Sequence, residues 1–279
     1  MPLRRELRRP AVGIATGGIL TRGIVTGGIL TGWLCAAPLA AGAAEPPVLG
    51  PDSTQVVFVV TADWTATRGT LAAFERDAGG PWRPHGAGHA VWVGRHGSAW
   101  GRGLHPPVAD GPQKREGDGR SPAGVFAVGP AFGAAATCET GLEYRPLSID
   151  DWCIDVADSP LYNRIVDARE VGAAAVAGST EPMRRDLHLD GDRAYALGFV
   201  IGHNGDCRPG AGSCIFAHLE GDPPGPTAGC TAMTEDRLAA LLRWLRAEAR
   251  PRFVLLPAAE AAKHASAWGV PTPPGPERP

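Results

Sequence analysis

Short runs of β-branched and apolar residues, separated by Gly and Pro turns, recur along most of the chain. The run at 55–61, Gln-Val-Val-Phe-Val-Val-Thr, is almost continuously apolar, which favours a strand at the centre of a sheet. Further strands are expected at 70–76, 90–94, 124–128, 195–203, 213–218 and 252–256. Many short strands at this spacing predict a mainly β fold, built as a sandwich of antiparallel strands.

One stretch follows a helical period instead. Its leucines are Leu238, Leu241, Leu242 and Leu245, the spacing of a single helix face. Thr234 precedes them as an N-cap residue, and two acidic residues follow it, which suits the positive end of a helix dipole. We therefore expect one helix that begins after Thr234 and packs its leucine face against the sheet.

The N-terminus has the pattern of an export signal. Four arginines at positions 4, 5, 8 and 9 precede an apolar stretch, and Ala41-Gly42-Ala43 has the small-x-small form of a signal-peptidase site. We expect a signal peptide at 1–43, with an uncleaved membrane anchor as the alternative. The rest divides into a linker at 44–54, one catalytic domain at 55–257 and a Pro-rich tail at 258–279.

Charge and cysteine content limit the possible functions. Without residues 1–43 the chain keeps 22 basic and 28 acidic residues, a net charge of about −6, which argues against a nucleic-acid-binding protein. Five cysteines remain, at 138, 153, 207, 214 and 230, and an odd number in an oxidising compartment leaves one thiol unpaired. We expect Cys230 to be that thiol. Pairs 207–214 and 138–153 are preferred because they close short loops.

Cys230 and His218 form the strongest candidate for a catalytic pair. The eleven residues between them include three prolines and three glycines, which predicts a stiff loop after a strand that ends at His218. A nearby imidazole lowers the pKa of a thiol and accepts its proton, and the positive end of the following helix would favour the thiolate. The N–H groups of Gly229 and Cys230 could then form an oxyanion hole.

Two motifs in this order resemble the L,D-transpeptidase (YkuD) family. One is His218 followed by Thr227-Ala228-Gly229-Cys230. The other is the segment 114–126, Lys-Arg-Glu-Gly-Asp-Gly-Arg-Ser-Pro-Ala-Gly-Val-Phe, which is expected as a hairpin. The resemblance covers about residues 90–256. It implies a YkuD-like β-sandwich with one packed α-helix after the catalytic cysteine, and no metal or other cofactor. The chain departs from the family at Ala228, where many members have His, and at Ala232, where they have Arg.

By this resemblance the protein would be an exported peptidoglycan L,D-transpeptidase of the periplasm or cell wall. Cys230 would attack a stem-peptide carbonyl, His218 would act as the base, and the acyl group would pass to an amine. We expect inhibition by carbapenem β-lactams, a monomer, and no nucleic-acid partner. The alternatives are an L,D-carboxypeptidase of the same fold, a non-catalytic wall-binding module and a zinc-stabilised secreted protein.

Four further residues are candidates for substrate binding: Thr227, Arg115, Arg120 and His203. The two arginines could replace the guanidinium that Ala232 lacks. His203 is also the alternative base, with His218 then structural. The aromatic residues of 144–170 are read as buried anchors of an irregular loop, and 171–194 as an insertion or lid without an assigned place.

A zinc site is the competing interpretation of the Cys and His residues. His203, Cys207, Cys214 and His218 have a spacing that could supply four ligands. On a strand, however, Cys214 and His218 would lie about 13 Å apart, too far for one tetrahedral ion.

Overall fold

The structure is a computed structural model that describes residues 48–272. The expected signal peptide at 1–43 lies outside the described residues, as do the first part of the linker and the end of the tail. Within the described range, no helix is long and apolar enough to cross a bilayer. All these residues belong to one unit, 45–279.

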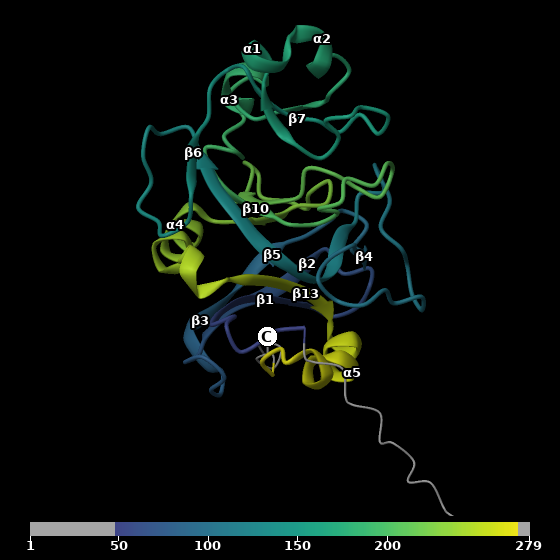
Figure 1. Ribbon diagram of the computed structural model, residues 1–279, viewed down its shortest axis with the longest axis vertical. Coiled ribbons are helices and arrows are strands. Elements are labelled where there is room, and N and C mark those ends of the chain that lie inside the picture. Colours follow the sequence, from purple (N-terminus) through teal and green to yellow (C-terminus); the bar gives the residue numbers. More distant parts are fainter. Residues whose placement is uncertain (1–47, 273–279) are drawn as a thin grey trace, which may run out of the picture. The chain divides into compact units, whose positions relative to one another are not determined.

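Eight strands close into a barrel in the order β10, β11, β12, β3, β2, β1, β13, β5, with β5 pairing back to β10 (Figure 1). Their bounds are β1 Gln55–Thr61, β2 Arg68–Glu75, β3 Arg83–Trp92, β5 Ser121–Gly133, β10 Leu197–Ile201, β11 Phe216–Leu219, β12 Thr231–Met233 and β13 Arg252–Pro257. The predicted mainly β fold is confirmed. The predicted sandwich is not, because the strands form a closed barrel.

The length of β5 explains the closure. This strand has 13 residues. Its first half pairs with β13, as at Val125 and Val254, and its second half pairs with β10, as at Ala131 and Phe199. Because β5 pairs with β13 along one part and with β10 along the other, it joins the two edge strands of the sheet and closes it into a barrel. The shortest strand pairing of the barrel is between β12 and β3, where Ala232 lies opposite Trp92.

The two strongest local patterns gave the right elements. β1 occupies the predicted residues and lies between β2 and β13, with every residue from Val56 to Val59 fully buried. Helix α4 (Glu235–Trp244) buries Leu238, Leu241 and Leu242 and packs against β10 and β11. Thr234 is the N-cap residue of this helix, as predicted, although its hydroxyl bonds to the side chain of Asp236 rather than accepting a helix N–H.

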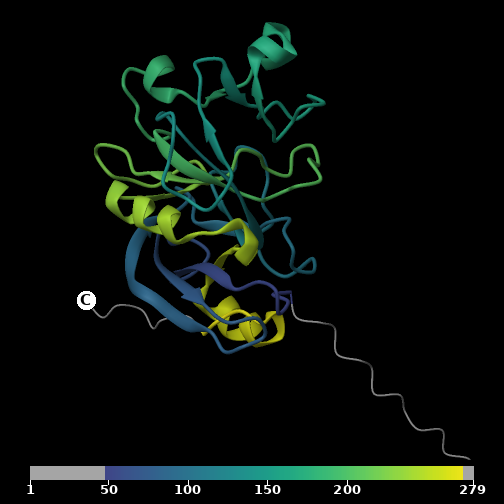
Figure 2. The same ribbon diagram turned by 60° about the vertical axis from the view of Figure 1, so that its left-hand side comes forward.

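Residues 147–194 form a small layer of their own, which we call the cap. It holds a three-stranded sheet and three one-turn helices: β7 Asp151–Cys153, β8 Ile165–Asp167, β9 Glu181–Pro182, α1 Ala168–Val171, α2 Ala173–Val176 and α3 Arg185–His188. Figures 1 and 2 both place the cap at one end of the barrel. The interpretation of Tyr162 as a buried anchor agrees with its exposed fraction of 1%.

The predicted hairpin before 124–128 does not form. β4 (Ser98–Trp100) pairs in parallel with the start of β5, and β6 (Tyr144–Pro146) pairs in parallel with its end. Two parallel strands need a crossover connection rather than a tight turn. Residues 101–120 form this connection between β4 and β5, and they contain no helix or strand. Within it, Lys114 is buried and its ammonium group bonds to Asp118 at 2.5 Å.

The C-terminal part of the chain also differs from the prediction. Helix α5 (Ala258–Trp268) covers β13 and β1 where a Pro-rich tail was expected, and it buries Ala261, Ala265 and Trp268. Its sequence is rich in alanine, a strong helix former. A short 3₁₀ turn, η1 (Ala247–Ala249), precedes β13. The expected linker joins the fold as well, because Leu49 is buried and donates its N–H to Trp268 O (2.9 Å).

Candidate active site

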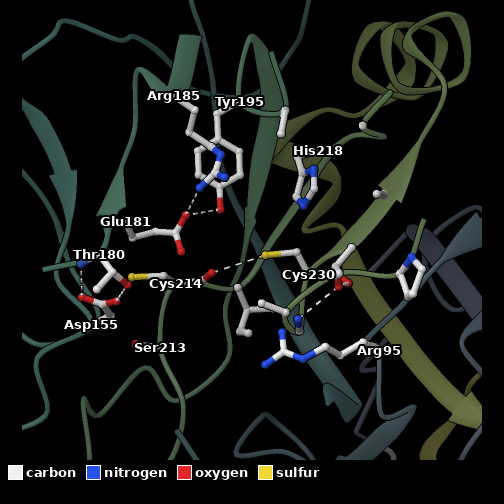
Figure 3. A pocket seen from close by; sticks show the side chains of 18 of the residues that line it. Arg95, Asp155, Thr180, Glu181, Arg185, Tyr195, Ser213, Cys214, His218 and Cys230 are labelled. Atoms are coloured by element: carbon white, nitrogen blue, oxygen red, sulfur yellow. Dashed lines mark hydrogen bonds and ion pairs between the residues drawn. The ribbon is translucent and has the colours of Figure 1, made fainter. Parts of the chain in front are cut away.

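Cys230 and His218 come from neighbouring strands and line one cavity. β11 and β12 run parallel, with His218 opposite Ala232. Cys230 directly precedes β12, and its Sγ accepts the N–H of Phe216 (3.3 Å). Because side chains alternate along strands, the thiol and the imidazole lie on the same face. Both line a cavity of about 400 Å³, and Figure 3 shows the imidazole above Cys230.

The carbonyl of Cys230 is held by two hydroxyl groups. Ser121 Oγ donates to it at 3.0 Å and Thr227 Oγ1 at 2.7 Å. Ser121 also accepts the N–H of Gly94 (2.9 Å). Ser121 belongs to one of the motifs that resemble the transpeptidase family, and Thr227 and Cys230 belong to the other. The two motifs, about 100 residues apart in sequence, therefore meet at the backbone carbonyl of Cys230.

Gly229 is required by the shape of this turn. Its φ is +154°, and a Cβ added there would lie 3.0 Å from the carbonyl oxygen of Arg120. Its N–H donates to Thr227 Oγ1 (3.0 Å), so this group is already bonded. Of the two N–H groups expected to form an oxyanion hole, the Cys230 N–H is the one left for that role.

His218 is held in its neutral form. Its Nδ1 donates to the carbonyl of Leu219 (2.7 Å), which leaves the lone pair on Nε2. The ring of Tyr195 packs edge-on against the imidazole at 5.3 Å between centroids. Burial lowers the pKa of His218 to about 4. The imidazole is therefore uncharged at neutral pH and able to accept a proton.

The thiol is also neutral in the resting site. Burial raises the pKa of Cys230 to about 12, and the nearby charge of Glu181 adds to this effect. The Phe216 N–H and the Tyr195 hydroxyl favour the thiolate, but not enough to reverse the direction. The expectation that the helix end and the imidazole hold a thiolate is therefore wrong for the resting state.

The cap builds the opposite wall of the cavity. Tyr195, two residues before β10, donates its hydroxyl to Glu181 Oε1 (2.7 Å), and Arg185 Nη1 lies 3.0 Å from the same oxygen. Arg185 also bonds to Asp192 (2.6 Å). Burial raises the pKa of both Glu181 and Tyr195 above their ordinary values. Sequence reasoning missed these residues, although Glu181, Arg185 and Asp192 belong to the insertion at 171–194 that had no assigned place, and Tyr195 directly follows it.

A disulfide joins the cap to the site. Cys153 on β7 is bonded to Cys214, which precedes β11. The predicted pairs 207–214 and 138–153 were wrong, whereas Cys230 is a free thiol as predicted; Cys138 and Cys207 are also free. The entropy of closing a loop changes slowly with loop length, so the preference for short loops discriminated poorly between the possible cysteine pairings.

The disulfide also removes a ligand from the alternative zinc site. Cys214 is bonded to sulfur and cannot act as a thiolate ligand. Its carbonyl instead accepts the thiol of Cys230 at 3.4 Å. In the part of the chain that the structure describes, no group of three or more His, Cys, Asp or Glu side chains has the arrangement of a metal site.

His203 does not join the cavity of Cys230. Its exposed fraction is 2%, its Nδ1 accepts the N–H of Arg102 (3.2 Å), and its Nε2 donates to Ala211 O (3.0 Å). Both ring nitrogens are therefore bonded to backbone groups, and the side chain does not line the cavity. The geometry favours His218 as the base and gives His203 a structural position.

The two arginines expected to bind substrate also point elsewhere. The guanidinium of Arg120 donates to the carbonyls of Ser98 (3.0 Å) and Trp64 (3.3 Å). Arg115 is exposed, and it is not among the residues that line the cavity. Thr227 does line the cavity, but its hydroxyl bonds within the Cys230 turn.

Comparison with known proteins adds no assignment. No protein-family model, no curated protein and no solved structure matches this chain. The resemblance to the L,D-transpeptidases therefore depends on the two motifs themselves.

Proposed function

We propose that this protein is an exported cysteine acyltransferase of the L,D-transpeptidase kind, acting on peptidoglycan stem peptides. The observation that carries the proposal is the pair of Cys230 and His218 in one cavity, with Nδ1 of the imidazole bonded to a backbone carbonyl and the Nε2 lone pair available. The YkuD-like motifs support the same reading, because their two segments meet at Cys230 O.

In the first step, Cys230 Sγ attacks the carbonyl carbon of the donor peptide while its proton passes to His218 Nε2. The carbonyl oxygen becomes an oxyanion, which the Cys230 N–H stabilises. The C–N bond then breaks, and His218 returns the proton to the departing amine. The products of this half-reaction are a thioester on Cys230 and a free D-amino acid.

In the second step, an acceptor amine attacks the thioester and loses a proton to His218. The C–S bond breaks and Cys230 regains its proton, so the enzyme returns to its starting state. A positioned base of this kind typically contributes 10²–10⁴-fold to the rate. Because both partners are neutral at rest, the buried site keeps the thiol unreactive until a carbonyl group occupies the cavity.

The proposed location is the periplasm or cell wall. The disulfide between Cys153 and Cys214 is compatible with an oxidising compartment. There the acyl acceptor would be a neighbouring stem peptide or another exported amine, and a carbapenem would form a stable thioester with the same thiol.

Intact mass after incubation with a carbapenem tests this proposal. The expected result is one added inhibitor mass, located at Cys230 by peptide mapping, in the wild type and in a variant with Cys138 and Cys207 replaced by Ala. Cys230→Ala should give no adduct while remaining folded. If Cys230→Ala still gains the same inhibitor mass as the wild type, the proposal is contradicted.

A further inference from the structure

The cavity of Cys230 is lined by three basic side chains, of which two are already paired. Lys114 bonds to Asp118 at 2.5 Å and to a backbone carbonyl at 2.8 Å. Arg185 bonds to two carboxylates of the cap. The third, Arg95, is exposed and forms no ion pair with any residue in the range 48–272. Its charge is therefore available to a ligand.

The backbone of Arg95 is held close to Cys230 through Thr227. Its N–H donates to Thr227 O (2.8 Å), and the hydroxyl of Thr227 bonds to Cys230 O. Its side chain lies against Gly119, where an added Cβ would come within 3.0 Å of Nε. In Figure 3 the side chain runs below Cys230, on the side away from Glu181 and Tyr195.

The opposite side of the cavity is acidic. Figure 3 shows Asp155 and Glu181 on this side; Glu181 is paired with Arg185, whereas Asp155 is bonded to the Ser179 and Thr180 hydroxyls rather than to a basic group. An anionic part of a substrate is therefore repelled by the unpaired carboxylate of Asp155 and attracted to Arg95.

We infer that Arg95 binds a carboxylate of the acyl donor, which makes it a specificity-determining residue of this site. The inference depends on the acyl transfer proposed above. Arg95 takes the role that was expected of Arg115 and Arg120, which do not line the cavity. It would also supply the positive charge that is absent at Ala232, the residue opposite His218. A guanidinium suits this role because it can bind both carboxylate oxygens at once.

The carboxylate could come from the C-terminus of the donor or from the side chain whose carbonyl is attacked. Four synthetic tetrapeptides ending in D-alanine distinguish these sources: the C-terminus free or amidated, each with a carboxylate or an amide on the third side chain. Release of D-alanine gives kcat/KM for the wild type, Arg95→Ala and Arg95→Lys. Arg115→Ala, an exposed arginine outside the cavity, is the matched control.

Arg95→Ala should reduce kcat/KM at least tenfold on peptides with the recognised carboxylate and less than twofold on the matching amide. Arg95→Lys should keep part of this difference, and Arg115→Ala should match the wild type on all four peptides. If Arg95→Ala acylates but shows an equal loss, or no loss, on all four peptides, the inference is overturned while acyl transfer stands. A wild type that never acylates at Cys230 overturns both.

Discussion

Removing the disulfide between Cys153 and Cys214 should cost the fold about 4 kcal/mol. The bond joins residues 61 positions apart, and the loop-entropy relation gives about this value for a ring of that size. Because small domains are typically stable by only about 5–15 kcal/mol, the loss would be a large share of the total. Replacing both cysteines with Ala avoids leaving a new polar group in the apolar cluster that surrounds them.

Urea unfolding measures this loss directly. The matched control is the double variant Cys138→Ala, Cys207→Ala, which removes two free thiols and should change the free energy of unfolding by less than about 1 kcal/mol. The wild type in the presence of a reductant should unfold at nearly the same urea concentration as the cross-link variant, because both have lost the same constraint on the unfolded chain.

The reasoning fails if the cross-link variant loses less than about 1 kcal/mol. It also fails if the control pair loses as much, since the predicted pairs 207–214 and 138–153 would give that result. Acylation should slow as well in the cross-link variant. The carbonyl of Cys214 accepts the Cys230 thiol, and its N–H donates to Asn163 Oδ1 (2.9 Å), so the bond helps to position the nucleophile.

Two other predictions concern the pH response and the catalytic turn. Burial lowers the pKa of His218 and of His203 to about 4. When the pH is lowered from about 6.5 to 4, these histidines therefore take up protons in the unfolded chain but not in the folded chain. The free energy of unfolding should fall as the pH is lowered through this window. Urea midpoints at pH 7 and 4.5 should differ less in His218→Gln than in the wild type, and equal differences would contradict this. Gly229→Ala should destabilise the fold by about 1–3 kcal/mol and slow acylation, because its Cβ would press on Arg120 O. Gly225→Ala, in the same loop but with no atom within 4 Å of the added Cβ, should leave the urea midpoint unchanged, and an equal loss of stability in the two variants would exclude the steric explanation.

Local patterns predicted the elements that depend on neighbours in sequence. The apolar run of β1 and the leucine face of α4 specify their own structure, since each needs only a surface to pack on. The pairing of His218 with Cys230 could be predicted for a similar reason: a short stiff loop joins the two parallel strands that carry them.

Long-range features could not be predicted in this way. Closure of the barrel depends on β5 meeting β10, and the disulfide depends on the cap folding back over the barrel, neither of which leaves a periodic signal. Arg95 lies more than 120 residues before Cys230, in a Gly-rich stretch outside both motifs that resemble the transpeptidase family. The thiol pKa was misjudged because burial, which raises it, is a property of the folded site alone.

The central claim is that Cys230 acts with His218 as its base, and D-alanine release from a tetrapeptide tests it most directly. We predict that His218→Ala lowers kcat by at least 100-fold, while His203→Gln, checked by circular dichroism for an intact fold, stays within a few-fold of the wild type. If His203→Gln loses activity and His218→Ala keeps it, the site has been assigned to the wrong histidine.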